Sequence, residues 1–391
     1  MSPPEISETA VPATAVEWCE GSALSSFRWP QPDSLERRFL DSALRQPSSH
    51  WVANVQTRWQ LLRHGQTVFP VTVNETDYEN SWVASPFNAV ITYALEELRE
   101  VRSRRARWAL ACLIRSVAPV LKAARINQVV CVNNWLLSTS LYPDWQGDGL
   151  QALTDCLLAR YPQHVIMFRS LNSATNDGLM QQLRQAGWLL APSRQVYLCD
   201  DPVAALQKQN SQIDHRLLKR KTDYRVVTHA ELQDEDDHRI QELYNLLYLQ
   251  KYSQHNPQFT VALIRLWRQT GLLKMMGLRS PAGRLDGIVG CFGTSRVVTT
   301  PLLGYDVLLP QTLGLYRLLT ALVFQEARVS GRVLNLSSGA AQFKRHRGGV
   351  AAIEYSAVYC RHLPVFRRGV WTLLATLLDQ VGARVLRMWE L

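Results

Sequence analysis

The spacing of apolar residues changes from strand-like to helical in the second half of the chain. Val297–Leu309 is aliphatic and β-branched, and it is too short to favour a helix over a buried strand. Pro310 ends this strand, and from Gly314 apolar residues recur at helical spacing until Gly331 supplies a stop signal. The pattern therefore predicts a strand, a short loop and a helix in succession.

The predicted loop, Gln311-Thr312-Leu313-Gly314, lies where an anion can bind. The first N–H groups of a helix have no partner within the helix, and the helix dipole adds a partial positive charge there. A phosphate or pyrophosphate group fits such a position. Glycine has no Cβ, so a bulky anion can approach its backbone closely. The sequence thus predicts a phosphate-bearing ligand at the start of this helix.

A second copy of the same unit lies upstream. The apolar run Val129–Leu141 is followed by a loop, by a helical pattern from Leu150 and by a short strand at Val165–Phe168. The pairs Pro143 and Pro310, Asp144 and Gln311, and Gly147 and Gly314 share one spacing, and the strands at Val165 and Val333 keep it within one residue. A repeat of this length predicts a duplicated domain rather than a solenoid.

The motif Gln311-x-x-Gly314-x-Tyr316 resembles the Q/R-x-x-G-x-G/A signature of the GNAT acyltransferases, which hold the pyrophosphate of acyl-CoA with loop amides. Tyr316 stands where the signature has a small residue, which would narrow the groove or favour a carrier other than free CoA. Further segments look like the GNAT-type acyltransferases of bacterial biosynthetic gene clusters: Tyr248–Pro257, Leu302–Asp306, Gly314–Arg317, Phe343–Arg345 and His362–Pro364. Tandem GNAT domains also occur in Fem-type enzymes.

This resemblance implies an α/β fold with two GNAT-like domains in tandem, each a mixed central sheet flanked by helices. The expected order is a loose tail at 1–17, a non-catalytic N-terminal domain at 18–199, a basic helical connector at 200–225 and a catalytic C-terminal domain at 226–391. Asp144 replaces the Gln or Arg of the signature in the first copy. Because a carboxylate beside a pyrophosphate is unfavourable, that copy is not expected to bind a nucleotide-linked donor.

Acyl transfer from a thioester to an amine needs a bound donor, a proton acceptor for the amine, and a proton for the leaving thiolate. The resemblance implies donor binding by a set around the loop: Leu309, Gln311, Leu313, Gly314, Leu315, Tyr316, Arg317 and Lys344. Asp306 is the candidate base, although a buried aspartate bonded to backbone explains it equally well. The candidate acids are the tyrosines Tyr305, Tyr316 and Tyr355.

Candidate acceptor-binding residues are Tyr252, His255, Asn256, Asn335 and Ser337. The first three lie in a polar and aromatic loop that Pro257 could equally make a plain turn. The basic loop 344–347 is either a phosphate or carboxylate site or a solvated run. Five arginines of the predicted helix Glu96–Arg125 form either a solvated face or a contact for RNA or a carrier protein: Arg99, Arg102, Arg104, Arg105 and Arg107.

Composition narrows the class of partner. The 391 residues are 47% hydrophobic and 19% charged, which suits two or three globular domains. A net charge of +10 favours anionic partners: nucleotide phosphates, a phosphopantetheine carrier protein, tRNA or an acidic membrane face. The seven cysteines include no C-x-x-C pair, which suits a reducing cytoplasm. No metal, signal peptide or membrane-spanning segment is expected.

The sequence therefore predicts a cytoplasmic N-acyltransferase of a bacterial biosynthetic pathway. Its co-substrate would be acyl-CoA or an acyl-phosphopantetheine carrier, and its acceptor a small amine or amino acid. The alternatives are an aminoacyl-tRNA-dependent peptidyl transferase of the Fem type and a catalytically silent binding module. The predicted C-terminal helix Trp371–Val381 either packs on the sheet or lies on a membrane surface.

Overall fold

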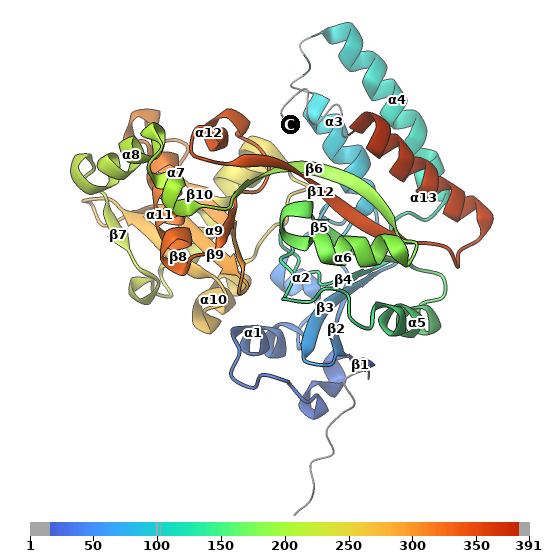
Figure 1. Ribbon diagram of the computed structural model, residues 1–391. Coiled ribbons are helices and arrows are strands. Elements are labelled where there is room, and N and C mark those ends of the chain that lie inside the picture. The colour runs from blue at the N-terminus through green and yellow to red at the C-terminus, as the bar shows by residue number, and fades with distance from the viewer. Residues whose placement is uncertain (1–15, 99–100, 102, 383–391) are drawn as a thin grey trace, which may run out of the picture.

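The computed structural model describes residues 16–98, 101 and 103–382, and these form a mixed α/β fold around one 12-stranded sheet (Figure 1). The strand order is β1-β2-β3-β4-β5-β12-β6-β11-β10-β9-β8-β7. The strands are β1 Val16–Cys19, β2 Arg58–His64, β3 Thr67–Asn74, β4 Val129–Val132, β5 Val165–Leu171, β6 Leu189–Cys199, β7 Arg225–Val227, β8 Lys274–Arg279, β9 Leu285–Gly293, β10 Val297–Tyr305, β11 Val333–Asn335 and β12 Val350–Tyr359.

Helices cover both faces of this sheet (Figure 1). They are α1 Leu35–Ala43, α2 Ser48–Trp51, α3 Tyr93–Glu97, α4 Arg104–Ala123, α5 Leu150–Arg160, α6 Ser173–Gln185, α7 Pro202–Leu206, α8 Gln209–Arg216, α9 Asp236–Asn245, α10 Val261–Thr270, α11 Leu315–Ser330, α12 Ala341–Arg345 and α13 Val365–Leu377. Short 3-10 and π turns are η1 Gly21–Ser26, η2 Asn88–Thr92, η4 Leu217–Lys221, η5 His229–Glu231, η6 Leu246–Tyr252, η7 Gln311–Leu313 and η8 Leu378–Gly382.

Both halves of the chain contain the repeated strand–helix–strand unit. The ladder of β4 and β5 is parallel and begins at the pair Val129–Val165. The ladder of β10 and β11 is also parallel and begins at Val297–Val333, so the two units keep the same spacing between their strands. The helix between the strands is α5 in the first unit and α11 in the second.

The halves exchange strands at the middle of the sheet. The last strand, β12, lies between β5 and β6 of the first half, and β6 in turn pairs with β11 of the second half. Each half therefore completes its part of the sheet with a strand from the other. The α/β class is confirmed, whereas the division into two tandem domains remains a prediction because the sheet is continuous.

Several predicted boundaries were wrong. The strand predicted at Val129–Leu141 ends at Val132, because Asn133 and Leu136 adopt positive φ angles of 57° and turn the chain. Val16 and Glu17, assigned to the tail, belong to β1 and pair with β2. The helix predicted from Glu96 to Arg125 is interrupted, since α4 begins only at Arg104.

Two alternatives concerned the basic helix and the C-terminal helix. Arg104 and Arg105 of the basic helix are exposed, as a solvated face requires. The α13 helix packs Trp371 on the sheet, in agreement with the packing interpretation. Other predicted positions lie outside the described residues: 1–15, Arg99 and Arg102.

Among the described residues no helix is long and apolar enough to cross a membrane.

Gly304 is a position where the fold leaves no room for a side chain. A Cβ built there would lie 2.6 Å from the backbone carbon of Leu243 and the backbone nitrogen of Tyr244, both in α9. Helix backbone cannot move aside as a flexible side chain can. We therefore expect Gly304→Ala to lower the free energy of unfolding by about 1–3 kcal/mol, measured by urea denaturation.

Gly369→Ala is the matched control, because Gly369 is exposed within α13 and a Cβ there meets no atom of the described residues within 4 Å. Alanine has a higher helix propensity than glycine, so the free energy of unfolding of this variant should rise by up to about 1 kcal/mol. Equal stability of the two variants would contradict the close packing of α9 on β10.

Candidate functional site

Strands β10 and β11 part from each other next to the predicted anion loop. Their ladder stops at the pair Thr299–Asn335, although β10 continues to Tyr305 and there pairs only with β9. Beyond Asn335 the chain leaves β10 but keeps its pairing with β6, through the hydrogen bond from the Leu336 N–H to the Tyr197 carbonyl. The edge of β10 from Leu302 to Tyr305 therefore has no strand partner on the side of β11 among the described residues, and we call this place the splay.

The predicted anion loop forms at the start of α11. Gly314 is the N-cap residue with φ 66° and ψ 30°, and the exposed turn η7 with Gln311 and Leu313 precedes it. The backbone N–H groups of Leu315, Tyr316 and Arg317 form the first turn of α11. Such groups have no partner within a helix and can donate to an anion. In the first half the equivalent left-handed N-cap is Gly149 with φ 70°, not Gly147 as the sequence alignment predicted.

A basic turn lies beside this helix start. The Leu217 side chain of η4 would contact a Cβ at Gly314 at 2.9 Å, so η4 lies directly against the loop. The same turn carries three exposed cations: Lys219, Arg220 and Lys221. An anion bound at α11 would therefore lie in a positive field from both the helix dipole and η4.

Arg317, predicted to bind the donor, is held by a carboxylate. Its Nε donates to Oδ1 of Asp214 at 2.6 Å, and Nε of Arg347 donates to Oδ2 of the same carboxylate at 2.6 Å. Asp214 belongs to α8 and is 1% exposed. The predicted connector thus anchors α11 and the basic loop to each other, and two of the predicted cations share one carboxylate, which compensates one of their two charges.

Lys344 is buried below the basic loop. Its Nζ donates to the carbonyl oxygens of Ser337 at 3.2 Å and Ser338 at 2.6 Å, and it lies 5.8 Å from the centre of the Tyr197 ring. Burial, and then the charge of Arg194, lowers the pKa of Lys344 to about 7. The lysine therefore fastens the turn after β11 rather than facing solvent as a phosphate ligand.

Tyrosines gather at the splay. The ring centres of Tyr305 and Tyr316 lie 6.0 Å apart, and the ring centre of Tyr316 lies 4.7 Å from that of Phe343 in α12. Leu309 packs beneath them in the cluster under α11. Burial, and then the neighbouring Tyr252, raises the pKa of Tyr305. Burial likewise raises the pKa of Tyr316, so both phenols stay protonated at neutral pH.

Asp306 lies in a turn after β10 and not within the strand as predicted. Its Oδ2 accepts from Nη2 of Arg239 at 2.8 Å, Arg284 lies 3.3 Å away, and its Oδ1 accepts from the Leu308 N–H. Burial alone would raise the pKa of Asp306, but the bonds from Arg239 and Leu308 hold it below its usual range. The carboxylate has the partners of a structural residue, which favours that interpretation over a general base.

The predicted acceptor loop packs against the first half. Asn256 accepts from Nε1 of Trp82 at 3.0 Å, and its own amide donates to the Tyr248 carbonyl at 2.9 Å. His255 lies 3.4 Å from Glu96. Tyr252 is 55% exposed and lies 6.2 Å from Tyr248, whose ring stacks on Tyr244. The loop thus joins the splay to residues around Trp82.

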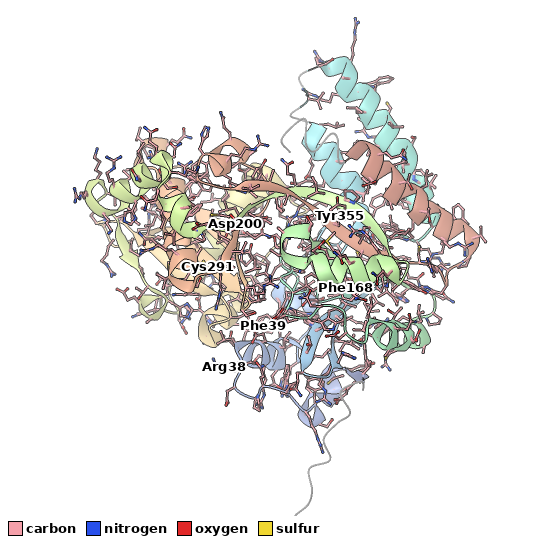
Figure 2. All side chains as sticks on the ribbon, in the orientation of Figure 1. Arg38, Phe39, Phe168, Asp200, Cys291 and Tyr355 are labelled. Atoms are coloured by element: carbon pink, nitrogen blue, oxygen red, sulfur yellow. The ribbon has the colours of Figure 1, made fainter. Side chains whose placement is uncertain are left out.

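Of three other predicted residues, Tyr355 lies apart, whereas Asn335 and Ser337 contact each other. Tyr355 of β12 packs in the cluster under α5 and α6, near Phe168 and away from Cys291 (Figure 2). Asn335 accepts from the Ser337 N–H and faces a cavity between the halves. Ser337 uses its carbonyl to bind Tyr197 and Lys344. The structure therefore does not bring Tyr355 together with Tyr305.

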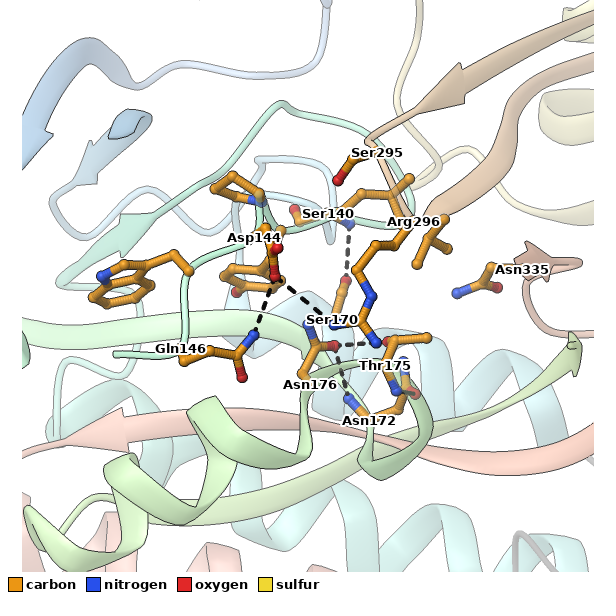
Figure 3. Close-up of a pocket in the computed structure, with 15 residues that line it drawn as sticks. Ser140, Asp144, Gln146, Ser170, Asn172, Thr175, Asn176, Ser295, Arg296 and Asn335 are labelled. Atoms are coloured by element: carbon orange, nitrogen blue, oxygen red, sulfur yellow. Dashed lines mark hydrogen bonds and ion pairs between the residues drawn. The ribbon is translucent and has the colours of Figure 1, made fainter. Parts of the chain in front are cut away.

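That cavity has a volume of about 20 Å3, the size of one or two water molecules. It lies between the loop of the first unit and the turn before β10, as Figure 3 shows. Asp144 faces Arg296 of the second half at 3.8 Å, and the buried hydroxyl of Ser140 has no hydrogen-bond partner among the described residues. The cavity is too small for a nucleotide.

Sequence reasoning missed Asp214 and two arginines that flank Trp82. Cζ of Arg169 lies 5.3 Å from the Trp82 ring centre, and Cζ of Arg194 lies 5.4 Å from it. Each arginine stands alone within a strand pattern, so no spacing marked it. Asp214 had a signal, since it is the one acidic residue between the cations Lys208 and Lys221 of the connector.

No family model matches the sequence, and no curated protein matches it either. Among solved structures, FemX shares 8% identity over 58% of this chain and 79% of its own, with a TM-score of 0.44. L-PGS from Bacillus licheniformis shares 13% identity over 58% of this chain and 77% of its own, with a TM-score of 0.42.

A tandem GNAT protein from the clavulanic acid biosynthesis pathway covers more of the chain. It shares 12% identity over 88% of this chain and 98% of its own, with a TM-score of 0.39. These three structures share parts of the α/β arrangement with this chain at low identity, and at such TM-scores the similarity assigns no reaction to it.

Proposed function

We propose that the protein is an acyltransferase. It would move an acyl group from a phosphate-bearing thioester, either acyl-CoA or an acyl-phosphopantetheine carrier, to the amine of an amino acid or biosynthetic intermediate. The observation that supports this most is the coincidence of the splay with the glycine-capped start of α11. A thioester donor needs both features, one for its phosphates and one for its extended arm.

The two features divide the donor between them. The phosphates would accept from the first-turn N–H groups of Leu315, Tyr316 and Arg317, in the field of η4. The extended pantetheine arm would lie along the edge of β10 from Leu302 to Tyr305, where the strand has no partner on the side of β11. This edge brings the thioester to the tyrosines of the splay.

Tyr305 is the residue we assign to the leaving group. It ends β10, is partly exposed and has a raised pKa, so at neutral pH it carries a proton that it can donate to the departing thiolate. Asp306 follows it directly, but its ion pairs with Arg239 and Arg284 occupy the carboxylate. We therefore assign Asp306 a positioning role at the end of β10 rather than the role of a base.

An aminoacyl-tRNA donor is the second candidate. The observation that favours it is the set of exposed cations on η4 beside the helix start: Lys219, Arg220 and Lys221. Such a patch suits a polyanion larger than CoA. Under this alternative the splay would hold an aminoacyl ester rather than a thioester.

Calorimetric titration with CoA, acetyl-CoA and pantetheine tests the proposal. CoA and acetyl-CoA should bind with a Kd near the micromolar range, worth about 8 kcal/mol. Pantetheine has no phosphates and should bind at least tenfold more weakly. Absence of binding by CoA and acetyl-CoA would contradict a free CoA donor, and tight binding of a charged tRNA would then support the second candidate.

A further inference from the structure

The cluster around Trp82 contains a cation without a carboxylate partner. Arg194 of β6 pairs with Glu354 of β12, which is 2% exposed, and this pair is neutral. Arg169 of β5 shares the Trp82 ring with Arg194, yet no carboxylate of the described residues lies within 4 Å of its guanidinium. The two arginines and Glu354 therefore leave one positive charge uncompensated.

An uncompensated charge in a partly buried place is unfavourable for folding alone. Burial, together with the charge of Arg194, lowers the pKa of Arg169. Proteins rarely retain such a group without a ligand or partner for it, because an unpaired buried charge is strongly destabilising. Arg169 remains partly exposed, so a ligand can reach it from solvent.

The guanidinium of Arg169 also has donors to spare. Its two hydrogen bonds, to the Val83 carbonyl at 2.8 Å and to Oδ1 of Asn134 at 3.3 Å, both use Nη1. Its Nε and Nη2 make no hydrogen bond to any residue that the structure describes. This pair of N–H groups has the planar fork geometry that binds a carboxylate through two parallel bonds.

The surroundings connect this arginine to the acceptor side of the proposed reaction. Trp82 donates to Asn256 of the predicted acceptor loop. Arg194 lies close enough to Tyr248 and Tyr93 to influence the electrostatics of both rings. These aromatic side chains are partly exposed and provide an apolar wall beside the cation.

We propose that Arg169, with Trp82 and the Arg194–Glu354 pair, binds the carboxylate of the acyl acceptor. Naming the ligand as the acceptor rests on the proposed acyl transfer, whereas the binding site itself does not. One uncompensated charge matches a monoanion. A phosphate monoester dianion would bring a second negative charge close to Glu354, so the site favours an amino acid or another carboxylate with an apolar or aromatic part.

A matched pair of small ligands tests this assignment by calorimetry. Benzoate and benzamide have the same shape, but only benzoate carries the negative charge. Benzoate should bind the wild-type protein at millimolar concentration and benzamide at least tenfold more weakly. Phenyl phosphate should also bind more weakly than benzoate, and tighter binding of it would overturn the choice of a carboxylate. Equal affinity for benzoate and benzamide would overturn the site.

Benzoate binding by variants of Arg169 and of a control arginine tests whether the ligand binds at Arg169. Arg169→Gln should weaken benzoate binding at least tenfold, whereas Arg58→Gln, at a surface arginine 55% exposed and paired with Glu75, should leave it unchanged. If Arg169→Gln does not fold, Arg169→Lys retains the charge without the fork and should still weaken binding several-fold. Unchanged benzoate affinity in the folded Arg169 variants would overturn the proposal.

A second titration separates this proposal from the proposed function. CoA should bind the Arg169→Gln variant as it binds the wild type, since Arg169 lies outside the donor loop. Benzoate binding without CoA binding would leave the anion site in place and contradict free CoA as the donor of the proposed reaction. CoA binding without benzoate binding would remove the acceptor site alone.

Discussion

Asp214→Asn is expected to lower the free energy of unfolding by about 3–5 kcal/mol. Asp214 is 1% exposed and accepts hydrogen bonds from both Arg317 and Arg347. An asparagine keeps the shape but removes the negative charge, and its NH2 group would face one of the guanidinium groups. Arg347 is itself buried, so its charge would lose its only carboxylate among the described residues.

The surface variant Asp41→Asn is the control for this measurement. Asp41 pairs with Arg45 one helical turn away, and the two side chains are 38% and 56% exposed. Its loss should change stability by at most about 0.5 kcal/mol. Urea denaturation of both variants checks the difference. A loss below about 1 kcal/mol in Asp214→Asn would show that α8 does not hold α11 through this carboxylate.

Because of Lys344, the free energy of unfolding should rise with pH. The amine has a pKa of about 7 in the folded protein and an ordinary value of 10.5. Between these values the unfolded chain binds the proton and the folded chain does not, so raising the pH favours folding. The gain is at most about 1.4 kcal/mol for each pH unit in this interval.

Lys344→Met isolates this contribution, because methionine is apolar and of similar length. Urea denaturation at about pH 7, 8 and 9 should show the variant more stable than the wild type at the lowest pH. The difference should narrow as the pH rises. A difference that does not change with pH would mean that Lys344 keeps its proton in the folded protein.

The central unit of the fold was predictable because its signals are local. The helical period from Gly314 to Gly331, with Pro310 before it, marks a strand, a turn and a helix within one stretch of chain. The structure places α11 and β11 where this pattern predicts them. The second copy was predictable for the same reason, although Gly149 and not Gly147 forms its left-handed cap.

The exchange of β6 and β12 was not predictable from local patterns. Either strand would satisfy the same alternation wherever it paired, and the choice depends on contacts between residues far apart in the chain. The prediction that Asp306 lies within the strand was wrong for another reason. Its arginine partners come from α9 and from the turn before β9, which are distant in the chain. Arg169 and Trp82 likewise lie far apart in the chain and meet only in the folded first half.

The measurement that tests the central claim most directly is CoA binding by two variants of Thr312. This exposed residue is the middle one of η7, the turn that directly precedes Gly314. Thr312→Glu places a negative charge at the proposed phosphate site while favouring the helix dipole, and Thr312→Gln changes the size without the charge. Calorimetry should show about tenfold weaker CoA binding for Thr312→Glu and nearly unchanged binding for Thr312→Gln. The loss of affinity in Thr312→Glu should be smaller at high salt, because salt screens the repulsion between the two negative charges. Equal CoA affinity of the two variants would contradict a phosphate-bearing donor at the start of α11.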